Sequence, residues 1–196
     1  VMRLTLRILS LLLVLSVTGT ALGASQRKVP AYEKYIKQYS SLAIQHQKKY
    51  RIPASITLAQ GLLESGAGRS ELARKSNNHF GIKCHSDWRG GRVYHDDDLR
   101  GECFRKYKNP EQSYEDHARF LVDRPRYASL FKLKITDYKG WARGLQKCGY
   151  ATDRAYANRL IKLIEDYDLY KYDRKGVYSE RKLQKNPWLM SPHPVY

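Results

Sequence analysis

The sequence predicts an α+β fold that is mainly helical, with one small β-hairpin lobe inserted between helices. Apolar residues recur at helical spacing in most segments between residues 31 and 169. One stretch, residues 77–110, has no helical period and carries glycine turn signals next to β-forming residues. A run of helices interrupted by a single hairpin is typical of folds that segregate helices from the sheet.

Two helices and a short third one are predicted before the hairpin. Residues 31–50 are amphipathic, with an apolar face made of Tyr32, Tyr35, Ile36, Tyr39, Leu42 and Ala43. Residues 54–65 are apolar nearly all round, which predicts a buried central helix that ends at Gly66. Residues 70–76 form a short helix with Ser70 as its N-terminal cap.

The hairpin and the later helices follow from local signals. Strands are expected at residues 92–95 and 102–107, with turns at Gly90-Gly91 and Arg100-Gly101. Helices resume in three segments, residues 110–123, 135–148 and 153–169, the last with Asp153 as a plausible cap. Residues 171–196 lose periodicity and contain three prolines, so we expect a loosely held basic tail.

Length and charge bound the class of protein. The chain has 196 residues, with 36 Lys and Arg against 19 Asp and Glu, and a formal net charge of +17. This length fits one domain, which we place at residues 31–170, with a terminal extension. The positive charge favours an acidic partner: nucleic acid, an anionic membrane surface or an anionic cell-wall polymer. Composition does not choose among these three.

The first 24 residues have the layout of a secretory signal peptide. Arg3 and Arg7 form a positive start, an apolar run follows from Ile8 to Val17, and small residues then offer a cleavage site. The alternative, a membrane anchor, needs about 20 apolar residues, and this run is shorter. We therefore expect a periplasmic or secreted protein with no stable membrane anchor after cleavage, which argues against nucleic acid as the partner.

The three cysteines make an odd count. In an oxidising compartment one pair can bond and leave one thiol over. Cys84 and Cys103 flank the predicted hairpin, which makes them the better pair and leaves Cys148. The alternative is a zinc site, but the spacing of Cys84 with His79, His85 and His95 fits no recognised ligand pattern. We predict no metal and no cofactor.

Glu64 is the residue that most needs an explanation, because it ends an apolar helix. A buried carboxylate is costly unless it is paired or protonated, and burial raises its pKa. A Glu with a raised pKa can act as a general acid near neutral pH. The alternative is a helix-end Glu that points to solvent or pairs with Arg69.

A glycosidase needs a second carboxylate and a surface for sugar rings. The hairpin supplies four acids, which could equally be a solvated cluster: Asp96, Asp97, Asp98 and Glu102. Tyr and Trp side chains suit sugar rings because they combine flat apolar faces with polar rims. The candidates, each of which could instead pack in the core, are Trp88, Tyr94, Tyr127, Trp141, Tyr150 and Tyr156.

A longer pattern resembles a known family. The run ITLAQGLLESGAGRSELARKSNNHFGIKC is similar to the glucosaminidase family of bacterial cell-wall hydrolases, glycoside hydrolase family 73. The matching positions are Ala59, Gln60, Glu64, Ser65, Gly68, Asn77, Asn78, Phe80, Gly81, Ile82 and Lys83. The segments FRKY (104–107), RPRYASLF (124–131) and GYATDRAYANRL (149–160) follow in the family order, so the resemblance covers about residues 32–170.

The resemblance implies a lysozyme-like helical domain with a small β lobe. It also implies hydrolysis of the β-1,4 bond between N-acetylglucosamine and N-acetylmuramic acid in the glycan strands of peptidoglycan. In it Glu64 matches the catalytic acid, and Tyr150 matches an aromatic residue close to the reacting sugar. Substrate binding is expected from the cleft-lining loop and from two further tyrosines: Asn77, Asn78, Phe80, Tyr127 and Tyr156.

The sequence departs from the family pattern on the hairpin. Family members often carry a Glu there, whereas this stretch reads YHDDDLRGE and aligns in more than one way. Asp97 is our first choice for the second carboxylate, followed by Asp96, Asp98 and Glu102. That acid would serve as a base for water, or be replaced by the substrate's own acetamido group. A lytic transglycosylase and a non-catalytic wall-binding protein are the alternative functions.

Overall fold

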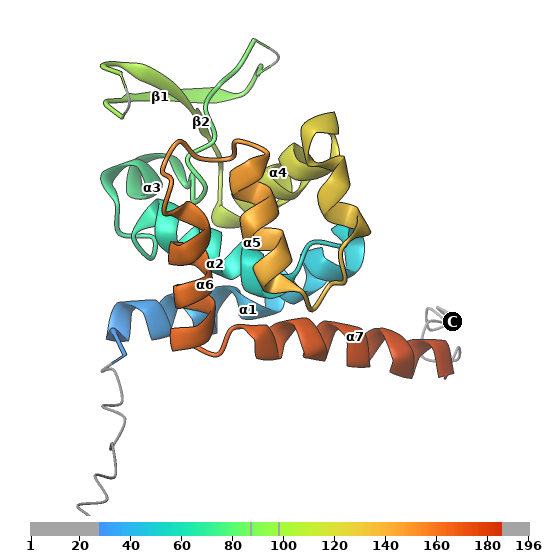
Figure 1. Ribbon diagram of the computed structural model, residues 1–196. Coiled ribbons are helices and arrows are strands. Elements are labelled where there is room, and N and C mark those ends of the chain that lie inside the picture. The colour runs from blue at the N-terminus through green and yellow to red at the C-terminus, as the bar shows by residue number, and fades with distance from the viewer. Residues whose placement is uncertain (1–27, 87, 98, 186–196) are drawn as a thin grey trace, which may run out of the picture.

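The computed structural model describes residues 28–86, 88–97 and 99–185, with side chains up to residue 177 (Figure 1). It confirms an α+β fold that is mainly helical. The elements, in chain order, are α1 (Pro30–Tyr50), α2 (Ala54–Ser65), α3 (Glu71–Ser76), β1 (Gly91–His95), β2 (Glu102–Lys106), α4 (Pro110–Val122), the 3-10 helix η1 (Pro125–Lys132), α5 (Tyr138–Lys147), α6 (Tyr156–Asp166) and α7 (Tyr170–Lys185). The predicted signal peptide lies outside the described residues. Within them, none of the helices has the length and apolar character needed to cross a membrane.

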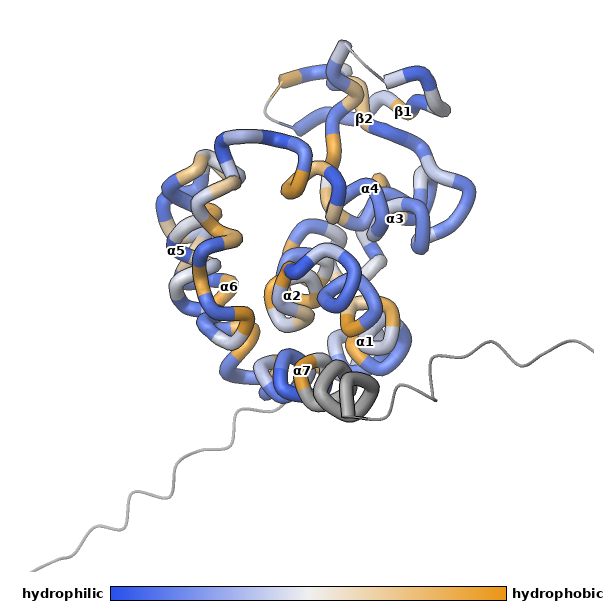
Figure 2. Tube along the Cα trace, turned by 90° about the vertical axis from the view of Figure 1, so that its right-hand side faces the viewer, coloured by the Kyte–Doolittle hydropathy of each residue, from blue (hydrophilic) through white to orange (hydrophobic). Residues whose placement is uncertain are grey.

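The buried centre of the helical body is α2, as its sequence predicts. Figure 2 shows it end-on, with α5 and α6 on one side, α1 on the other and α7 below. Ile56, Leu58 and Leu62 have no exposed surface, and burying each side chain contributes about 1.5–3 kcal/mol. The helix ends at Gly66, whose φ of 55° lies in the left-handed region that favours glycine. Glu64 therefore falls in the last turn of a rigid, packed helix.

The hairpin forms a separate lobe above this body (Figure 1). β1 and β2 pair antiparallel, with Gly91 opposite Lys106 and His95 opposite Glu102. The predicted disulfide between Cys84 and Cys103 is confirmed, with the Cα atoms 5.4 Å apart, and Cys148 is the free thiol. The disulfide ties β2 to the loop that follows α3.

Two details of the later helices differ from the prediction. The helix predicted from residue 153 begins at Tyr156, so Asp153 is not its cap. The Asp153 side chain instead accepts a hydrogen bond from the Ala155 N–H, at 2.8 Å, within the preceding turn. The second detail is η1, which the sequence analysis did not predict. This 3-10 helix is short, and its apolar residues do not follow the α-helical period.

The expectation of a loosely held tail from residue 171 was wrong for its described part. This segment forms α7, which lies along α1 and α2 (Figure 1). Asp173 is fully buried, and its carboxylate accepts hydrogen bonds from the Ser55 N–H at 2.8 Å and the Ser55 hydroxyl at 2.7 Å. The Gln47 amide donates to the Asp173 carbonyl at 2.9 Å. A polar contact with the first turn of α2 thus holds α7, and apolar periodicity cannot reveal such a contact.

Candidate active site

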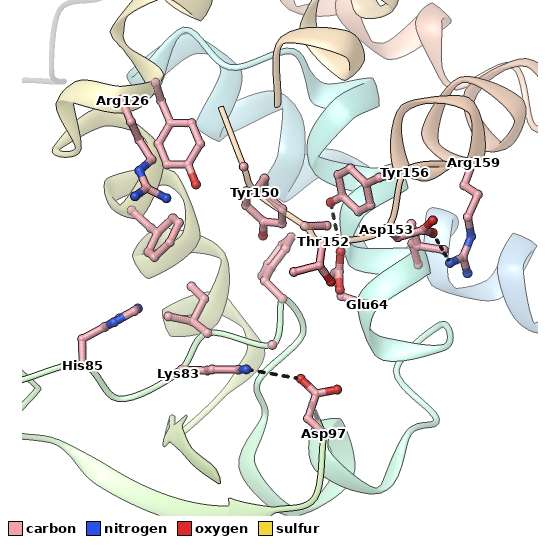
Figure 3. A pocket seen from close by; sticks show the side chains of 18 residues that line it. Glu64, Lys83, His85, Asp97, Arg126, Tyr150, Thr152, Asp153, Tyr156 and Arg159 are labelled. Carbon is pink, nitrogen blue, oxygen red and sulfur yellow. Dashed lines mark hydrogen bonds and ion pairs between the residues drawn. The ribbon is translucent and has the colours of Figure 1, made fainter. Parts of the chain in front are cut away.

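A cleft of about 470 Å³ lies between the helical body and the hairpin lobe. Figure 3 shows Glu64, Tyr150 and Tyr156 on the helical side, and Lys83 and Asp97 facing them from the loop and hairpin. The lining comes from the end of α2, the loop after α3, the hairpin turn, α4, η1, the loop before α6 and α6 itself. Its residues are Leu63, Glu64, Phe80, Gly81, Ile82, Lys83, His85, Asp97, Phe120, Arg126, Tyr127, Gly149, Tyr150, Ala151, Thr152, Asp153, Tyr156 and Arg159.

The environment of Glu64 is that of a proton donor. Burial is the main cause that raises its pKa, from 4.5 to about 7. The Tyr156 hydroxyl donates a hydrogen bond to Glu64 Oε1 at 2.9 Å, and this bond and the charge of Arg159 pull the pKa down, while the charge of Asp97 pushes it up. Both protonation states of Glu64 are therefore accessible near neutral pH, as proton transfer requires.

A buried network fixes the orientation of Glu64. The Gln60 amide Nε2 donates to the Tyr156 hydroxyl at 3.0 Å, and Gln60 Oε1 lies 3.1 Å from His117 Nε2. Because the amide oxygen can only accept, His117 Nε2 carries the hydrogen in this pair. Burial lowers the pKa of His117 to about 3, so the ring is neutral. Each donor of this chain points to the next acceptor along it, and the last, the Tyr156 hydroxyl, donates to Glu64 Oε1. Because Oε1 already accepts this hydrogen bond, we place the proton of neutral Glu64 on Oε2.

Among the described hairpin acids, Asp97 lines the cleft, and its role as the second carboxylate stays a prediction. Its carboxylate lies 3.7 Å from Lys83 Nζ, and its side chain is 53% exposed. Glu102 also pairs with Lys83, at 2.8 Å, but its side chain is only 16% exposed and does not line the cleft. Asp96 Oδ1 accepts the Gly101 N–H at 2.7 Å and so holds the hairpin turn. Asp98 lies outside the described residues.

Only some of the aromatic residues that were candidates for sugar binding line the cleft. Phe80, Tyr127, Tyr150 and Tyr156 line the cleft as predicted, and the rings of Tyr150 and Tyr156 stack with centroids 5.6 Å apart. The other three candidates do not line it. Trp141 is 1% exposed in the core, Tyr94 projects from the hairpin, and Trp88 packs against the guanidinium of Arg105 at 4.6 Å.

The prediction that Asn77 and Asn78 line the cleft was wrong. The Asn77 amide donates to the Tyr107 carbonyl at 3.1 Å. Asn78 is 1% exposed, and its amide nitrogen donates to the carbonyls of Ile82 and Arg105, both at 2.9 Å. The two asparagines hold the loop of Phe80 and Ile82 against β2, so their amides are occupied by backbone groups.

Three cationic residues of the cleft were missed at the level of sequence. Arg159 lies one helical turn after Tyr156, and that i, i+3 spacing could have placed it on the same face. Lys83 matches the family pattern, but the sequence analysis did not predict that it lines the cleft. For Arg126, which precedes Tyr127 in a 3-10 helix, no periodic signal was available.

Comparisons with known proteins show which family this chain resembles. Residues 40–169 match the family model described as mannosyl-glycoprotein endo-beta-N-acetylglucosaminidase. The exo-glucosaminidase LytG of Bacillus subtilis is 39% identical over 140 residues, which cover 64% of this chain and 48% of LytG. The peptidoglycan hydrolase FlgJ of Vibrio parahaemolyticus is 32% identical over 147 residues, covering 69% of this chain and 47% of FlgJ. The chain thus spans about half the length of these curated relatives.

Solved structures show the same fold. The catalytic domain of the autolysin Auto from Listeria monocytogenes is 33% identical, with a TM-score of 0.61, and the match covers 74% of this chain and 89% of that domain. These neighbours confirm the lysozyme-like helical domain with a small β lobe that the resemblance implied. The matched residues include every residue that lines the cleft, from Leu63 to Arg159. The chain belongs to the glucosaminidase family of glycoside hydrolases.

Proposed function

We propose that the chain is an exported peptidoglycan hydrolase that cleaves the β-1,4 bond between N-acetylglucosamine and N-acetylmuramic acid, with Glu64 as general acid. The observation that carries this proposal is a carboxyl group in a cleft, held by Tyr156, with its pKa raised to about 7. The printed names of relatives in the same family, exo-glucosaminidase and peptidoglycan hydrolase, support the substrate class.

In the proposed reaction the proton on Glu64 Oε2 passes to the glycosidic oxygen as the bond from that oxygen to the sugar C1 breaks. Positive charge develops on the sugar ring, and water then adds to C1 and loses a proton. Asp97 faces Glu64 from the hairpin side of the cleft and is half exposed to solvent, so we assign it to accept that proton. The stacked rings of Tyr150 and Tyr156 supply the wall beside the reacting sugar.

A substrate-assisted route is the alternative for the second half of this step. In that route the acetamido oxygen of the substrate attacks C1, and no hairpin carboxylate takes the proton of water directly. The half-exposed position of Asp97 favours the general-base route, because a base for water must reach solvent.

Export to the cell envelope is part of the proposal. The disulfide between Cys84 and Cys103 supports it, since disulfides persist in oxidising compartments. The formal charge of +17 is complementary to an anionic cell-wall polymer. The family membership of relatives named as autolysin and peptidoglycan hydrolase agrees with this location.

The test is digestion of purified peptidoglycan by the full chain, with Glu64→Gln as the inactive control. Mass spectrometry of the products identifies the new ends. We expect N-acetylglucosamine at the new reducing ends. Reducing N-acetylmuramic acid would contradict the bond assignment, and anhydro-muramyl ends would identify a lytic transglycosylase. Binding to the wall without release of fragments would identify a non-catalytic wall-binding protein.

A further inference from the structure

The cations of the cleft differ in whether an acid neutralises them. Lys83 pairs with Asp97 at 3.7 Å and with Glu102 at 2.8 Å. Arg159 pairs with Asp153 at 3.0 Å. Arg126, at the opposite end of the cleft from Arg159 in Figure 3, has no carboxylate in ion-pair contact within the described part of the chain.

A second hollow adjoins the cleft at His85 and Phe120. This hollow, of about 500 Å³, shares His85 and Phe120 with the cleft and adds the side chains of Arg119 and Arg124. The guanidinium of Arg124 lies over the Phe120 ring, 3.7 Å from its centroid, which holds it at the junction of the two spaces. Like Arg126, Arg124 is in ion-pair contact with no carboxylate from residues 28–86, 88–97 and 99–177.

The acids near this end do not cancel the positive charge. Asp116 lines the second hollow but is bound by Arg105, whose Nη1 lies 3.1 Å from its carboxylate. Arg119 pairs with Glu115 at 3.2 Å. Asp123 is the remaining acid of the hollow, and its single negative charge is fewer than the two positive charges of Arg124 and Arg126. This end of the cleft therefore keeps a net positive charge.

We propose that Arg126, with Arg124 in the adjoining hollow adding positive charge, binds a carboxylate of the glycan strand and thereby sets the register of the strand in the cleft. This inference rests on the proposed function. N-acetylmuramic acid carries an acidic lactyl group, or an acidic stem peptide attached to it, and N-acetylglucosamine carries neither. Guanidinium groups match carboxylates in planar, two-bonded geometry.

The consequence is a choice between two bonds. The sugars alternate along the strand, so carboxylates recur at every second sugar. A fixed carboxylate site at the Arg126 end allows only every second β-1,4 bond to lie at Glu64. Bond specificity would then come from charge at the end of the cleft and need no contact at the reacting sugar.

The experiment uses peptide-free glycan strands with free lactyl carboxylates and the same strands after conversion of those carboxylates to neutral methylamides. A third substrate, strands with intact stem peptides, distinguishes the lactyl from the peptide carboxylate. The variants are Arg126→Gln, Arg126→Lys and the matched control Arg143→Gln, an exposed arginine of α5 outside the cleft. The readouts are kcat/KM and the identity of the new reducing ends.

We expect Arg126→Gln to lower kcat/KM about tenfold on a carboxylate-bearing strand and less than twofold on the neutral strand, which is the size expected for one charged hydrogen bond. Arg126→Lys should recover part of the loss, the control should show none, and Arg126→Gln should release both kinds of reducing end. A loss confined to peptide-bearing strands supports the site and assigns it to the stem peptide.

Equal losses of Arg126→Gln on charged and neutral strands, or no loss on any strand, overturn the carboxylate site and leave the proposed function intact. Failure of the wild-type chain to hydrolyse every strand is a different result, because it removes the proposed function and this inference with it.

Discussion

The two walls of the cleft present carboxylates in opposite environments. Glu64 lies in the last turn of a buried helix, and a chain of hydrogen bonds from His117 through Gln60 and Tyr156 supports it. Asp97 lies on the hairpin turn, 53% exposed, with one ion pair to Lys83. One carboxyl group is thus desolvated and keeps part of its proton near neutral pH, and the other is solvated. In the proposed reaction, these two environments suit two carboxyl groups to the two roles of acid and base.

The walls also differ in how firmly they are held. The helical wall is part of the main core, where interior packing resists displacement. Among the helices, the hairpin packs mainly on α3, and the Cys84–Cys103 disulfide adds a covalent tie to the neighbouring loop. Regions with fewer buried contacts open at lower free energy, so the hairpin wall is the one that can move relative to the substrate.

The largest expected effect comes from removing the acid of the helical wall. Glu64→Gln keeps the shape and the hydrogen bond from Tyr156 but has no proton to donate. We expect kcat on peptidoglycan to fall at least about 1000-fold while the circular dichroism spectrum stays unchanged. A folded variant with near-normal activity would remove Glu64 from the mechanism and end the contrast between the two walls.

The hairpin wall is tested by Asp97→Asn, with an expected loss of about 100-fold, at the low end for a general base. Asp96→Asn and Glu102→Gln are the matched controls, because those acids hold the turn and Lys83 and do not line the cleft. Asp98→Asn completes the set. If none of the four substitutions lowers kcat more than about tenfold, the substrate-assisted route is the better account.

The same Glu64→Gln variant tests the burial of the Glu64 carboxyl group, through the pH dependence of the free energy of unfolding. The pKa of Glu64 is about 7 when folded and near 4.5 ordinarily, so the folded state binds the proton more tightly. The free energy of unfolding therefore falls as pH rises from about 4.5 through 7, by up to about 3 kcal/mol from this group. The variant lacks this decline. Asp173, with a pKa raised to about 6, contributes the same slope to both proteins and cancels in the comparison.

Tyr156→Phe sharpens the account of the helical wall. The Tyr156 hydroxyl stabilises the ionised form of Glu64, so its loss raises the pKa of Glu64 further. We expect the alkaline limb of kcat/KM to move above pH 7 by about one unit, with a loss in kcat below tenfold at acidic pH. Tyr138→Phe is the matched control, since that hydroxyl donates to Glu165 at 3.1 Å outside the cleft. A limb that stays in place would show that Tyr156 does not tune Glu64.

The smallest effect on activity is expected from the disulfide. A Cys84→Ser, Cys103→Ser double variant loses a crosslink over a 19-residue separation, worth about 3 kcal/mol. We expect lower hydrogen-exchange protection in the hairpin, a loss in activity smaller than that of Tyr156→Phe, and an alkaline limb still near pH 7. Cys148→Ser serves as the control. A shift of the alkaline limb would show that the two walls are coupled and contradict the separation drawn here.

Much of the fold could be predicted because its signals are local. Helical periodicity located α1, α2 and α4, and the glycine turn signals located the hairpin. Ser70 caps α3 as expected, accepting from the Ala73 N–H at 3.1 Å. The α7 helix was missed because Asp173 and Ser55, 118 residues apart, make the contact that anchors it. Contacts over such separations leave no mark in a window of neighbouring residues.

The sequence by itself determined which residues can do the chemistry: an acid that ends an apolar helix and matches a family pattern, and acids on a hairpin turn where the chain departs from that pattern. Only the tertiary structure decided which of these residues share a cleft. It placed Asp97 there, turned Asn77 and Asn78 to the backbone, and brought Arg126 to one end. The physical reason is that the burial of Glu64, and with it the pKa of Glu64, depends on neighbouring side chains from α4 and α6. These helices are distant from Glu64 in the sequence and come next to it only when the chain folds.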